Sequence, residues 1–265
     1  MHNTRYRSNT VIVPKITQNP STILSMVYTR GTANHRANKI NDYLTYKAGY
    51  TLNKVATLHS WQTTMIPREE IIFNASECYI GQDGWVPFTI GAAVLFNVDK
   101  CAIGTHTRTL LCSISSGTDN KRRGDTNKNR SIYLNNLARN GFLNQILSPT
   151  KYCQTISDYK FVVSPEGNGI DCHRHYEALI AGCIPIIEKH AGIEEKYRGC
   201  PILWTEDYSE ITEEYLAAKY AEMIDQVYDF SRLFLSSYPR GIQSAIRHNG
   251  NYWSNKILGY EWYHL

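Results

Sequence analysis

The chain lacks a long apolar run, a strong excess of one charge and any closely spaced cysteine pair. Of its 265 residues 20% are charged, and the formal net charge of +4 is too small to argue for a nucleic-acid-binding surface. The longest apolar run, residues 178–187, is far below the roughly 20 residues that a membrane helix needs. No apolar segment follows the polar residues 1–10, so the sequence predicts a soluble chain without a signal peptide or an anchor.

The cysteines exclude two further classes of protein. There are seven of them, scattered along the chain, and none forms a C-x-x-C pair. An odd number in a chain of this length argues against a disulfide scaffold and predicts reduced thiols in the cytoplasm. His173 and His175 lie close in sequence, but no second pair follows at a ligand spacing and the two point to different sides of a helix. The sequence therefore predicts no metal site.

What the chain does contain is the pattern of an α/β protein. Hydrophobic residues make up 42% of it, and short apolar runs alternate with amphipathic segments in its second half. Strands are expected over residues 109–114, 159–163, 184–187 and 201–204, and helices over 131–139, 173–181 and 211–227. This alternation predicts a parallel sheet with crossover helices. Two Rossmann-like halves are the preferred architecture, and one larger doubly wound sheet is the alternative.

The most informative stretch is residues 161–187, FVVSPEGNGIDCHRHYEALIAGCIPII. An apolar strand ends at Val163, and a sharp turn follows that brings backbone N–H groups close to any ligand through Ser164, Glu166, Gly167, Asn168 and Gly169. Asp171 is expected to cap the next helix, and Arg174 in its first turn makes the helix N-terminus an anion site. The turn lies at the carboxyl edge of the predicted sheet, where ligands of open α/β folds bind.

Two side chains of this helix are candidates for contacts with such a ligand. Glu177 lies among apolar residues, where a carboxylate is costly unless donors satisfy it, and the hydroxyls of a ribose would do so. Pairing of Glu177 with Arg174, three residues earlier on the helix surface, is the alternative. His173, next to the turn, is expected to hydrogen-bond a phosphate or a sugar.

The pattern SPEGNG, then R-x-x-EAL-x-x-GC-x-PII, resembles the donor-binding module of GT-B glycosyltransferases and most of all the exostosin-like family. The resemblance covers residues 109–212 and is most specific within residues 161–187. It implies a GT-B-like fold, in which two Rossmann-like domains face each other across a cleft. It also implies transfer of a sugar from a UDP-sugar to a hydroxyl of a glycan or glycoprotein. Compact soluble members occur in large DNA viruses and some transfer xylose, which makes xylose the preferred donor sugar.

The resemblance also suggests roles for single residues. Glu177 matches the glutamate that binds the nucleotide ribose in the family. Glu166 precedes it with ten residues between them, whereas retaining enzymes have seven residues between the two glutamates. The longer spacing, together with Arg174, resembles the inverting pattern of the exostosin-like family. The chain contains no Asp-x-Asp pair, with which metal-dependent transferases hold their cation, so neither a metal nor another cofactor is expected. Stabilising the leaving diphosphate then falls to Arg174, the helix N-terminus and the loop 115–130. Candidates in that loop are Ser116, Thr118, Arg122, Arg123 and Arg130.

On this interpretation the chain divides into an acceptor-side domain over residues 1–103, a donor-binding domain over 104–245 and a C-terminal segment over 246–265. The last segment either packs back on the first domain or is a surface tail. The first domain is expected to supply the catalytic base. Candidates are Asp83, in a glycine-rich turn, and His35, after a predicted strand over residues 22–28; an ordinary exposed polar residue is the alternative for each.

Two other functions compete with this one. A nucleic-acid-binding protein would use the basic loop 121–130, but the loop lacks interleaved aromatic residues, and a solvated run of charges explains it as well. The basic residues of that reading are Arg108, Lys121, Arg122, Arg123, Lys128 and Arg130. A nucleotide-sugar-binding protein without transfer activity would bind the donor and turn over no acceptor. The preferred prediction remains a soluble, cytoplasmic glycosyltransferase whose partners are a nucleotide sugar and a glycan, with no nucleic acid.

Overall fold

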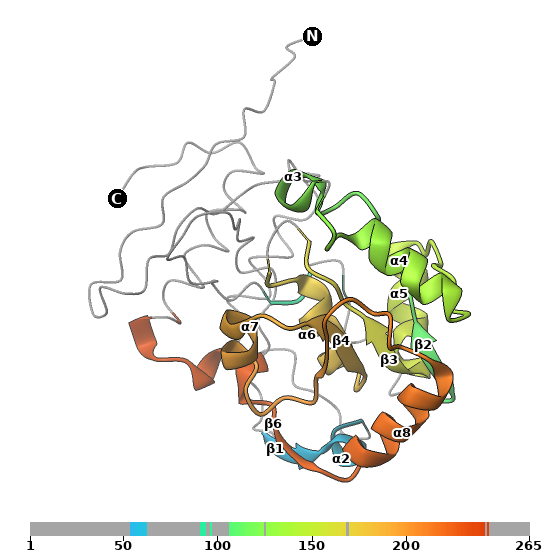
Figure 1. Ribbon diagram of the computed structural model, residues 1–265. Helices are drawn as coiled ribbons and strands as arrows, with labels where there is room; N and C mark the ends of the chain where they lie inside the picture. The colour runs from blue at the N-terminus through green and yellow to red at the C-terminus, as the bar shows by residue number, and fades with distance from the viewer. Residues whose placement is uncertain are drawn as a thin grey trace, which may run out of the picture.

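A four-stranded parallel sheet forms the centre of the fold (Figure 1). The computed structural model describes residues 54–62, 91–93, 96, 106–124, 126–167, 170–241 and 243. The strands follow the order β2 (Arg108–Leu111), β3 (Tyr159–Val163), β4 (Ile184–Glu188) and β5 (Leu203–Thr205) across the sheet. Phe161 in the middle of β3 aligns with Leu110 on one side and with Ile184 on the other. The predicted α/β class and parallel sheet are thus confirmed.

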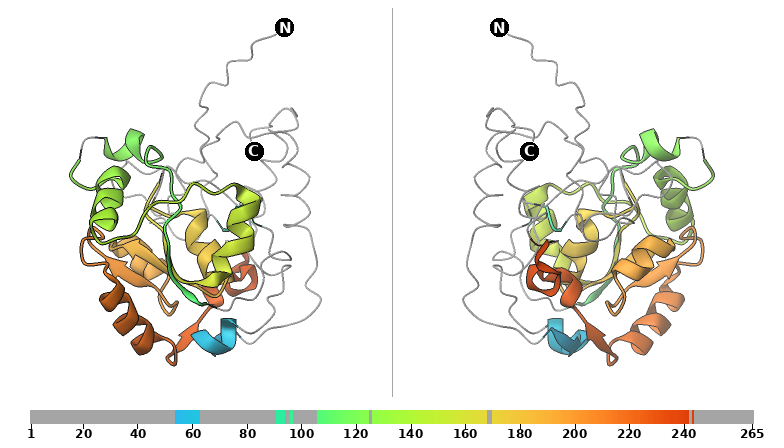
Figure 2. Two further views of the ribbon diagram at one scale, coloured as in Figure 1. Left: turned by 90° about the vertical axis from the view of Figure 1, so that its right-hand side faces the viewer. Right: turned by 90° about the vertical axis from the view of Figure 1, so that its left-hand side faces the viewer.

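Helices connect the strands and cover both faces of the sheet. They are α3 (Asn120–Arg123), α4 (Arg130–Arg139), α5 (Pro149–Thr155), α6 (His173–Ile180), α7 (Ala191–Lys196) and α8 (Glu213–Met223). Figure 2 shows α4 and α8 on one side of the sheet and α5 and α6 on the other. The sheet therefore lies between two layers of helices, and strand residues such as Phe161, Val163 and Ile186 are fully buried.

Local sequence explains where the helices begin and end. Asn129, Ser148 and Thr212 precede α4, α5 and α8, and each side chain accepts a hydrogen bond from the backbone N–H three residues later. Helix α6 ends before Gly182, whose φ of +76° is a left-handed conformation that glycine adopts without strain. Its N–H donates to the carbonyl of Leu179 and so satisfies one of the last carbonyls of the helix.

Three predicted elements differ from the observed ones. The strand expected over 109–114 ends at Leu111, because the amide of Asn144 takes both the N–H and the carbonyl of Ile114, at 2.9 Å each. Helix α8 ends at Met223, since residues 227–229 form a strand instead. The loop expected over 115–129 contains the short helix α3.

Residues 54–62 pack on this sheet domain, although the predicted division assigns them to the first domain. Strand β1 (Val55–Thr57) pairs antiparallel with β6 (Val227–Asp229), and α2 (Leu58–Gln62) follows it. The Trp61 indole stacks on Phe230 with 3.9 Å between ring centroids, and its Nε1 donates to the carbonyl of Leu179 at 2.8 Å. Gln62 donates to the carbonyl of Gly182 at 2.6 Å, so this segment covers the C-terminal end of α6.

The predicted strand over residues 22–28 and the C-terminal segment 246–265 lie outside the described residues. The division into two Rossmann-like domains stays a prediction.

Replacing Trp61 by alanine should lower the free energy of unfolding by about 3–5 kcal/mol, because it removes a buried ring and leaves a cavity. Urea unfolding measures the change. The control is Val227→Ala, a residue 71% exposed in the partner strand, which should change stability by less than about 0.5 kcal/mol. Equal effects of the two substitutions would contradict the packing of residues 54–62 on the sheet domain.

Candidate functional site

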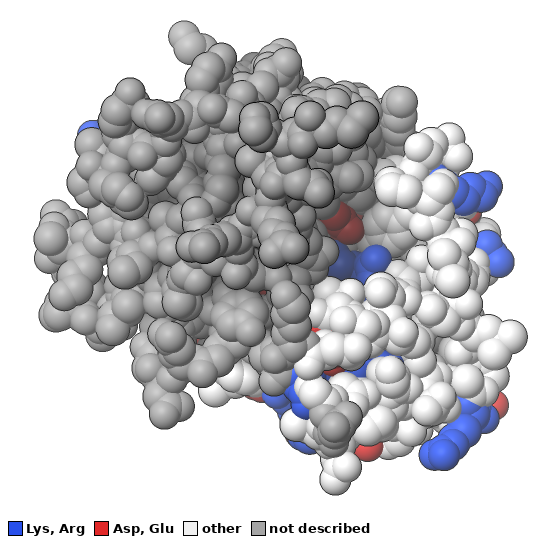
Figure 3. All heavy atoms as spheres, turned by 90° about the horizontal axis from the view of Figure 1, so that it is seen from above, with Lys and Arg blue, Asp and Glu red and all other residues white. Residues whose placement is uncertain are grey.

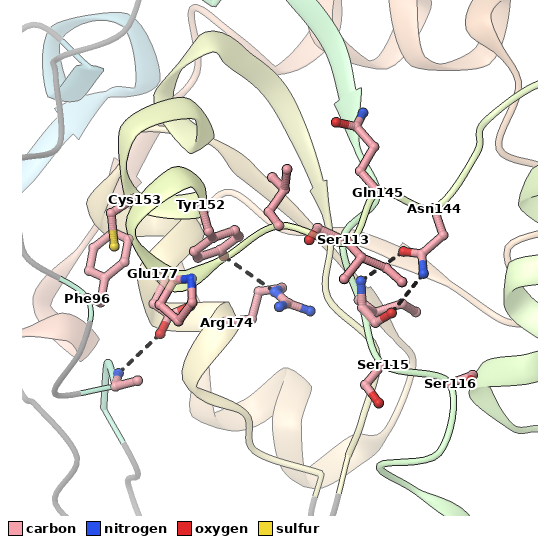
Figure 4. Close-up of a pocket in the computed structure, with 15 residues that line it drawn as sticks. Phe96, Ser113, Ser115, Ser116, Asn144, Gln145, Tyr152, Cys153, Arg174 and Glu177 are labelled. Carbon is pink, nitrogen blue, oxygen red and sulfur yellow. Dashed lines mark hydrogen bonds between the residues drawn. The ribbon is translucent and has the colours of Figure 1, made fainter.

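A cavity of about 640 Å³ lies at the carboxyl edge of the sheet, beside the first turns of α6 (Figure 4). Its walls are the residues that follow β2, the loop between α4 and α5, and the facing sides of α5 and α6. A cavity of this size is suited to a small organic ligand, and the carboxyl edge of a parallel sheet is where such ligands bind. This is the candidate site.

Arg174 and Glu177 both face this cavity, because residues three apart lie on one side of a helix (Figure 4). The Nε of Arg174 donates to the hydroxyl of Tyr152 at 3.4 Å, and its guanidinium carbon is 5.2 Å from the centroid of that ring. The Glu177 side chain is 6% exposed, and its Oε1 accepts a hydrogen bond from the N–H of Ala93 at 3.2 Å. In the described structure the two side chains bond to these neighbours and not to each other, so the predicted alternative of a surface pair does not apply.

The opposite wall of the cavity is polar as well. Ser116, a predicted ligand residue, lies there and is exposed. Sequence reasoning missed Ser113, Ser115 and Asn144, which line the same wall. The Asn144 amide is held by the backbone of Ile114, which orients the loop that carries it. No motif marks these residues. The place of Ser113 and Ser115 after a buried strand indicates those two, and nothing in the sequence indicates Asn144.

Arg130, predicted to bind the diphosphate, has other partners. Its side chain is 7% exposed and donates to three backbone carbonyls, those of Glu166 at 2.7 Å, Pro165 at 2.9 Å and Ser115 at 3.2 Å. Its own N–H donates to the Asp119 carboxylate at 2.9 Å. Arg130 therefore joins the loop after β2 to the turn after β3, and it does not line the cavity.

Space, and not backbone conformation, favours glycine at position 167. Its φ does not lie in the left-handed region. A Cβ added at Gly167 would lie 3.0 Å from the Nη2 of Arg130 and 3.3 Å from the methyl group of Thr118. A side chain at this position would have to displace Arg130 or Thr118 by a few tenths of an ångström. Thr118 packs here and not in the cavity wall.

Glu166 and Arg123 belong to a buried ion cluster. Arg123 pairs with Glu166 and, at 2.9 Å, with Glu188, whose other oxygen accepts the backbone N–H of Glu166 at 2.9 Å. Burial and the neighbouring Glu166 carboxylate raise the pKa of Glu188. Burial alone would lower the pKa of Arg123, but the carboxylates of Glu188 and Glu166 raise it. Neither Glu166 nor Arg123 lines the cavity, so both hold the turn in place.

The expectation that Asp171 caps α6 is wrong. The N-cap position is Cys172, which makes no side-chain cap hydrogen bond. The Asp171 carboxylate instead pairs with Lys196 and accepts a hydrogen bond from the Tyr197 hydroxyl at 2.7 Å. It thereby ties the start of α6 to α7. The two partners follow Asp171 by 25 and 26 positions in the sequence, so the local sequence does not reveal this arrangement.

Ser164 is hydrogen-bonded to His175: the Ser164 hydroxyl lies 2.7 Å from the Nδ1 of the histidine. The other ring nitrogen of His175, Nε2, lies 3.2 Å from the carbonyl of Ile170. Because a carbonyl only accepts, Nε2 carries the proton and Nδ1 accepts the Ser164 hydroxyl proton. Burial lowers the pKa of His175 to about 4, which keeps the ring neutral. Both side chains are fully buried and hold the turn together.

The remaining predicted residues are placed as follows. The Nδ1 of His173 lies 2.7 Å from the carbonyl of Gly91, outside the cavity lining. Asn168, Gly169, Asp83 and His35 lie outside the described residues, and so does the side chain of Arg122.

Neither the protein-family models nor the curated proteins match this chain. In the part of the chain that the structure describes, no group of three His, Cys, Asp or Glu residues is placed to hold a metal ion. None of the described helices has the length and apolar character of a membrane span.

The basic loop is not a continuous charged surface where it is described. Arg123 and Arg130 are turned inward, and Lys128 pairs with Glu206 at 3.4 Å. On the face seen in Figure 3, the Lys and Arg side chains of the described residues are spread apart and not gathered in one patch. This distribution does not favour the nucleic-acid alternative.

Replacing Arg130 by methionine should cost about 3 kcal/mol or more of unfolding free energy, because it leaves three buried backbone carbonyls without the donors of the guanidinium. The control is Lys128→Met, whose side chain is 63% exposed in its ion pair and should contribute at most about 1 kcal/mol. Urea unfolding compares the two variants. Equal losses of unfolding free energy would contradict the role of the Arg130 side chain in joining the two segments.

The neutral His175 should make stability depend on pH. Its pKa is about 4 in the folded protein against 6.5 when exposed, so the unfolded chain binds more protons between these values. Stability should therefore fall as the pH falls from 6.5 to 4, by about 3 kcal/mol from this residue. The variant His175→Gln has no group that titrates at this position. Its unfolding free energy should therefore fall less steeply between pH 6.5 and 4 than that of the unchanged protein. Parallel curves for both proteins would contradict the assignment.

Proposed function

We propose that this protein is an inverting, metal-independent glycosyltransferase of the GT-B type, similar to the exostosin-like family. It would bind a UDP-sugar, with xylose the preferred sugar, and transfer the sugar to a hydroxyl of a glycan or glycoprotein. The observation that carries the proposal is the placing of Arg174 and Glu177 side by side on one cavity at the carboxyl edge of the sheet. A nucleotide presents a ribose next to its phosphates, and this pair offers a carboxylate next to a guanidinium.

The spacing of the two groups fits such a ligand. Side chains three residues apart on a helix have Cβ atoms about 5–6 Å apart, close to the separation of a ribose from the first phosphate. The Glu177 carboxylate has one oxygen on Ala93 and would accept ribose hydroxyls with the other. In the described structure the terminal nitrogens of Arg174 make no hydrogen bond to protein, which leaves them for a phosphate.

The reaction would proceed by a single displacement. The acceptor oxygen attacks the anomeric carbon, the bond from that carbon to the diphosphate oxygen breaks, and the hydroxyl proton passes to a base. Arg174 and the N-terminus of α6 would stabilise the charge that develops on the leaving diphosphate. The base would come from the first domain, where Asp83 and His35 are the candidates.

Glu177→Gln should weaken binding of UDP by about 1–3 kcal/mol, since it removes the charged acceptor of the ribose hydroxyls. Isothermal titration calorimetry in EDTA measures the affinity, because the proposal requires no metal. The control is Glu214→Gln, an exposed residue of α8, which should leave the affinity unchanged.

Two outcomes would contradict the proposal. One is the absence of UDP binding to the unchanged protein, and the other is equal affinity of the unchanged protein and Glu177→Gln. UDP binding without release of UDP from UDP-xylose, in the presence of glycan acceptors, would instead support a binding protein without transfer activity.

A further inference from the structure

Tyr152 is held firmly beside the two proposed ligand residues. It lies on α5, which begins with the Ser148 cap and Pro149, and its side chain is 8% exposed. The edge of its ring contacts Phe96 with 6.4 Å between centroids. The buried ring packs on Phe96, and Tyr152 lines the cavity beside Arg174 (Figure 4).

This ring determines where the Arg174 guanidinium points. The guanidinium is planar. Its Nε donates to the Tyr152 hydroxyl at 3.4 Å, and its carbon lies 5.2 Å from the ring centroid. With these two contacts made, the terminal nitrogens extend away from Tyr152 toward the wall that carries Ser115 (Figure 4). That edge of a guanidinium binds one phosphoryl group through two parallel hydrogen bonds.

The direction of this one side chain matters because no other cation lies in the described lining of the cavity. Arg130 and Arg123, the nearby alternatives, are held by carbonyls and carboxylates elsewhere. An unoriented arginine would lose much of the benefit of a bidentate contact, since the ligand would then have to order it.

The Tyr152 hydroxyl accepts the Arg174 N–H as a neutral group. Burial, and then the charge of Glu177, raise the pKa of Tyr152 well above its ordinary value, so the hydroxyl stays protonated. It accepts from Arg174, and in the described structure its own proton has no protein acceptor.

We infer that Tyr152 is the positioning residue of a phosphoryl subsite: it directs the two terminal nitrogens of Arg174 at one phosphate of the ligand. The inference rests on the proposed function and goes beyond it, since it names the residue that separates phosphate-bearing ligands from the bare nucleoside. Tyr152 acts through Arg174, and Glu177 acts independently on the ribose.

Tyr152→Phe tests this assignment, because it keeps the ring, its contact with Phe96 and its packing, and removes only the hydroxyl. Calorimetry with UDP and with uridine should show the affinity for UDP lowered about tenfold and that for uridine unchanged. The ratio of the two affinities is read within each variant, so a partial loss of stability does not alter it.

The matched control is Tyr159→Phe. Tyr159 is also buried and also carries an arginine over its ring, Arg108 at 4.7 Å, but it begins β3 at the opposite edge of the sheet. Its hydroxyl should have no effect on the ratio. In an Arg174→Gln background, Tyr152→Phe should add less than twofold, since the group it positions is gone.

The outcomes separate the two proposals. If the unchanged protein binds no UDP, the proposed function fails, and this inference fails with it. If UDP binds and Tyr152→Phe leaves the UDP-to-uridine ratio unchanged, or lowers both affinities equally, the positioning role is overturned while the proposed function stands.

Discussion

The geometry of the candidate site depends on one buried guanidinium. Arg130 donates to carbonyls of the loop after β2 and of the turn after β3, and these two segments form the carboxyl edge of neighbouring strands. Backbone carbonyls buried in this way need donors, and a guanidinium supplies several from a rigid plane. Gly167 leaves room for this close approach, since a Cβ there would lie 3.0 Å from the Nη2 of Arg130.

Specific hydrogen bonds and an ion pair hold α6 at its two ends. At its start, His175 holds Ser164 while Asp171 ties the turn to Lys196. At its end, Trp61 donates to the carbonyl of Leu179 and Gln62 to that of Gly182, just beyond the helix. A helix anchored in this way presents Arg174 and Glu177 to the cavity in one arrangement, so that a ligand does not have to order them.

The sequence predicted those features that depend on local pattern. The strand over 159–163 and the helix beginning at His173 are observed as expected, because their apolar periodicity is decided within a few residues. The polar residues of the turn were harder to interpret, since a serine, a glutamate and an aspartate before a helix suit a ligand and an internal network equally well. Which of these applies is decided by distant partners: Arg123 binds Glu188 across 65 positions. Tyr152 and Asn144 belong to no motif, and only the folded chain reveals their place in the cavity wall.

The most direct test of the account is a crystal structure of the protein with UDP. The account predicts the phosphates against the terminal nitrogens of Arg174 and the ribose hydroxyls on Glu177, within the cavity at the start of α6. The nucleotide bound elsewhere, or bound there with neither side chain in contact, would contradict it.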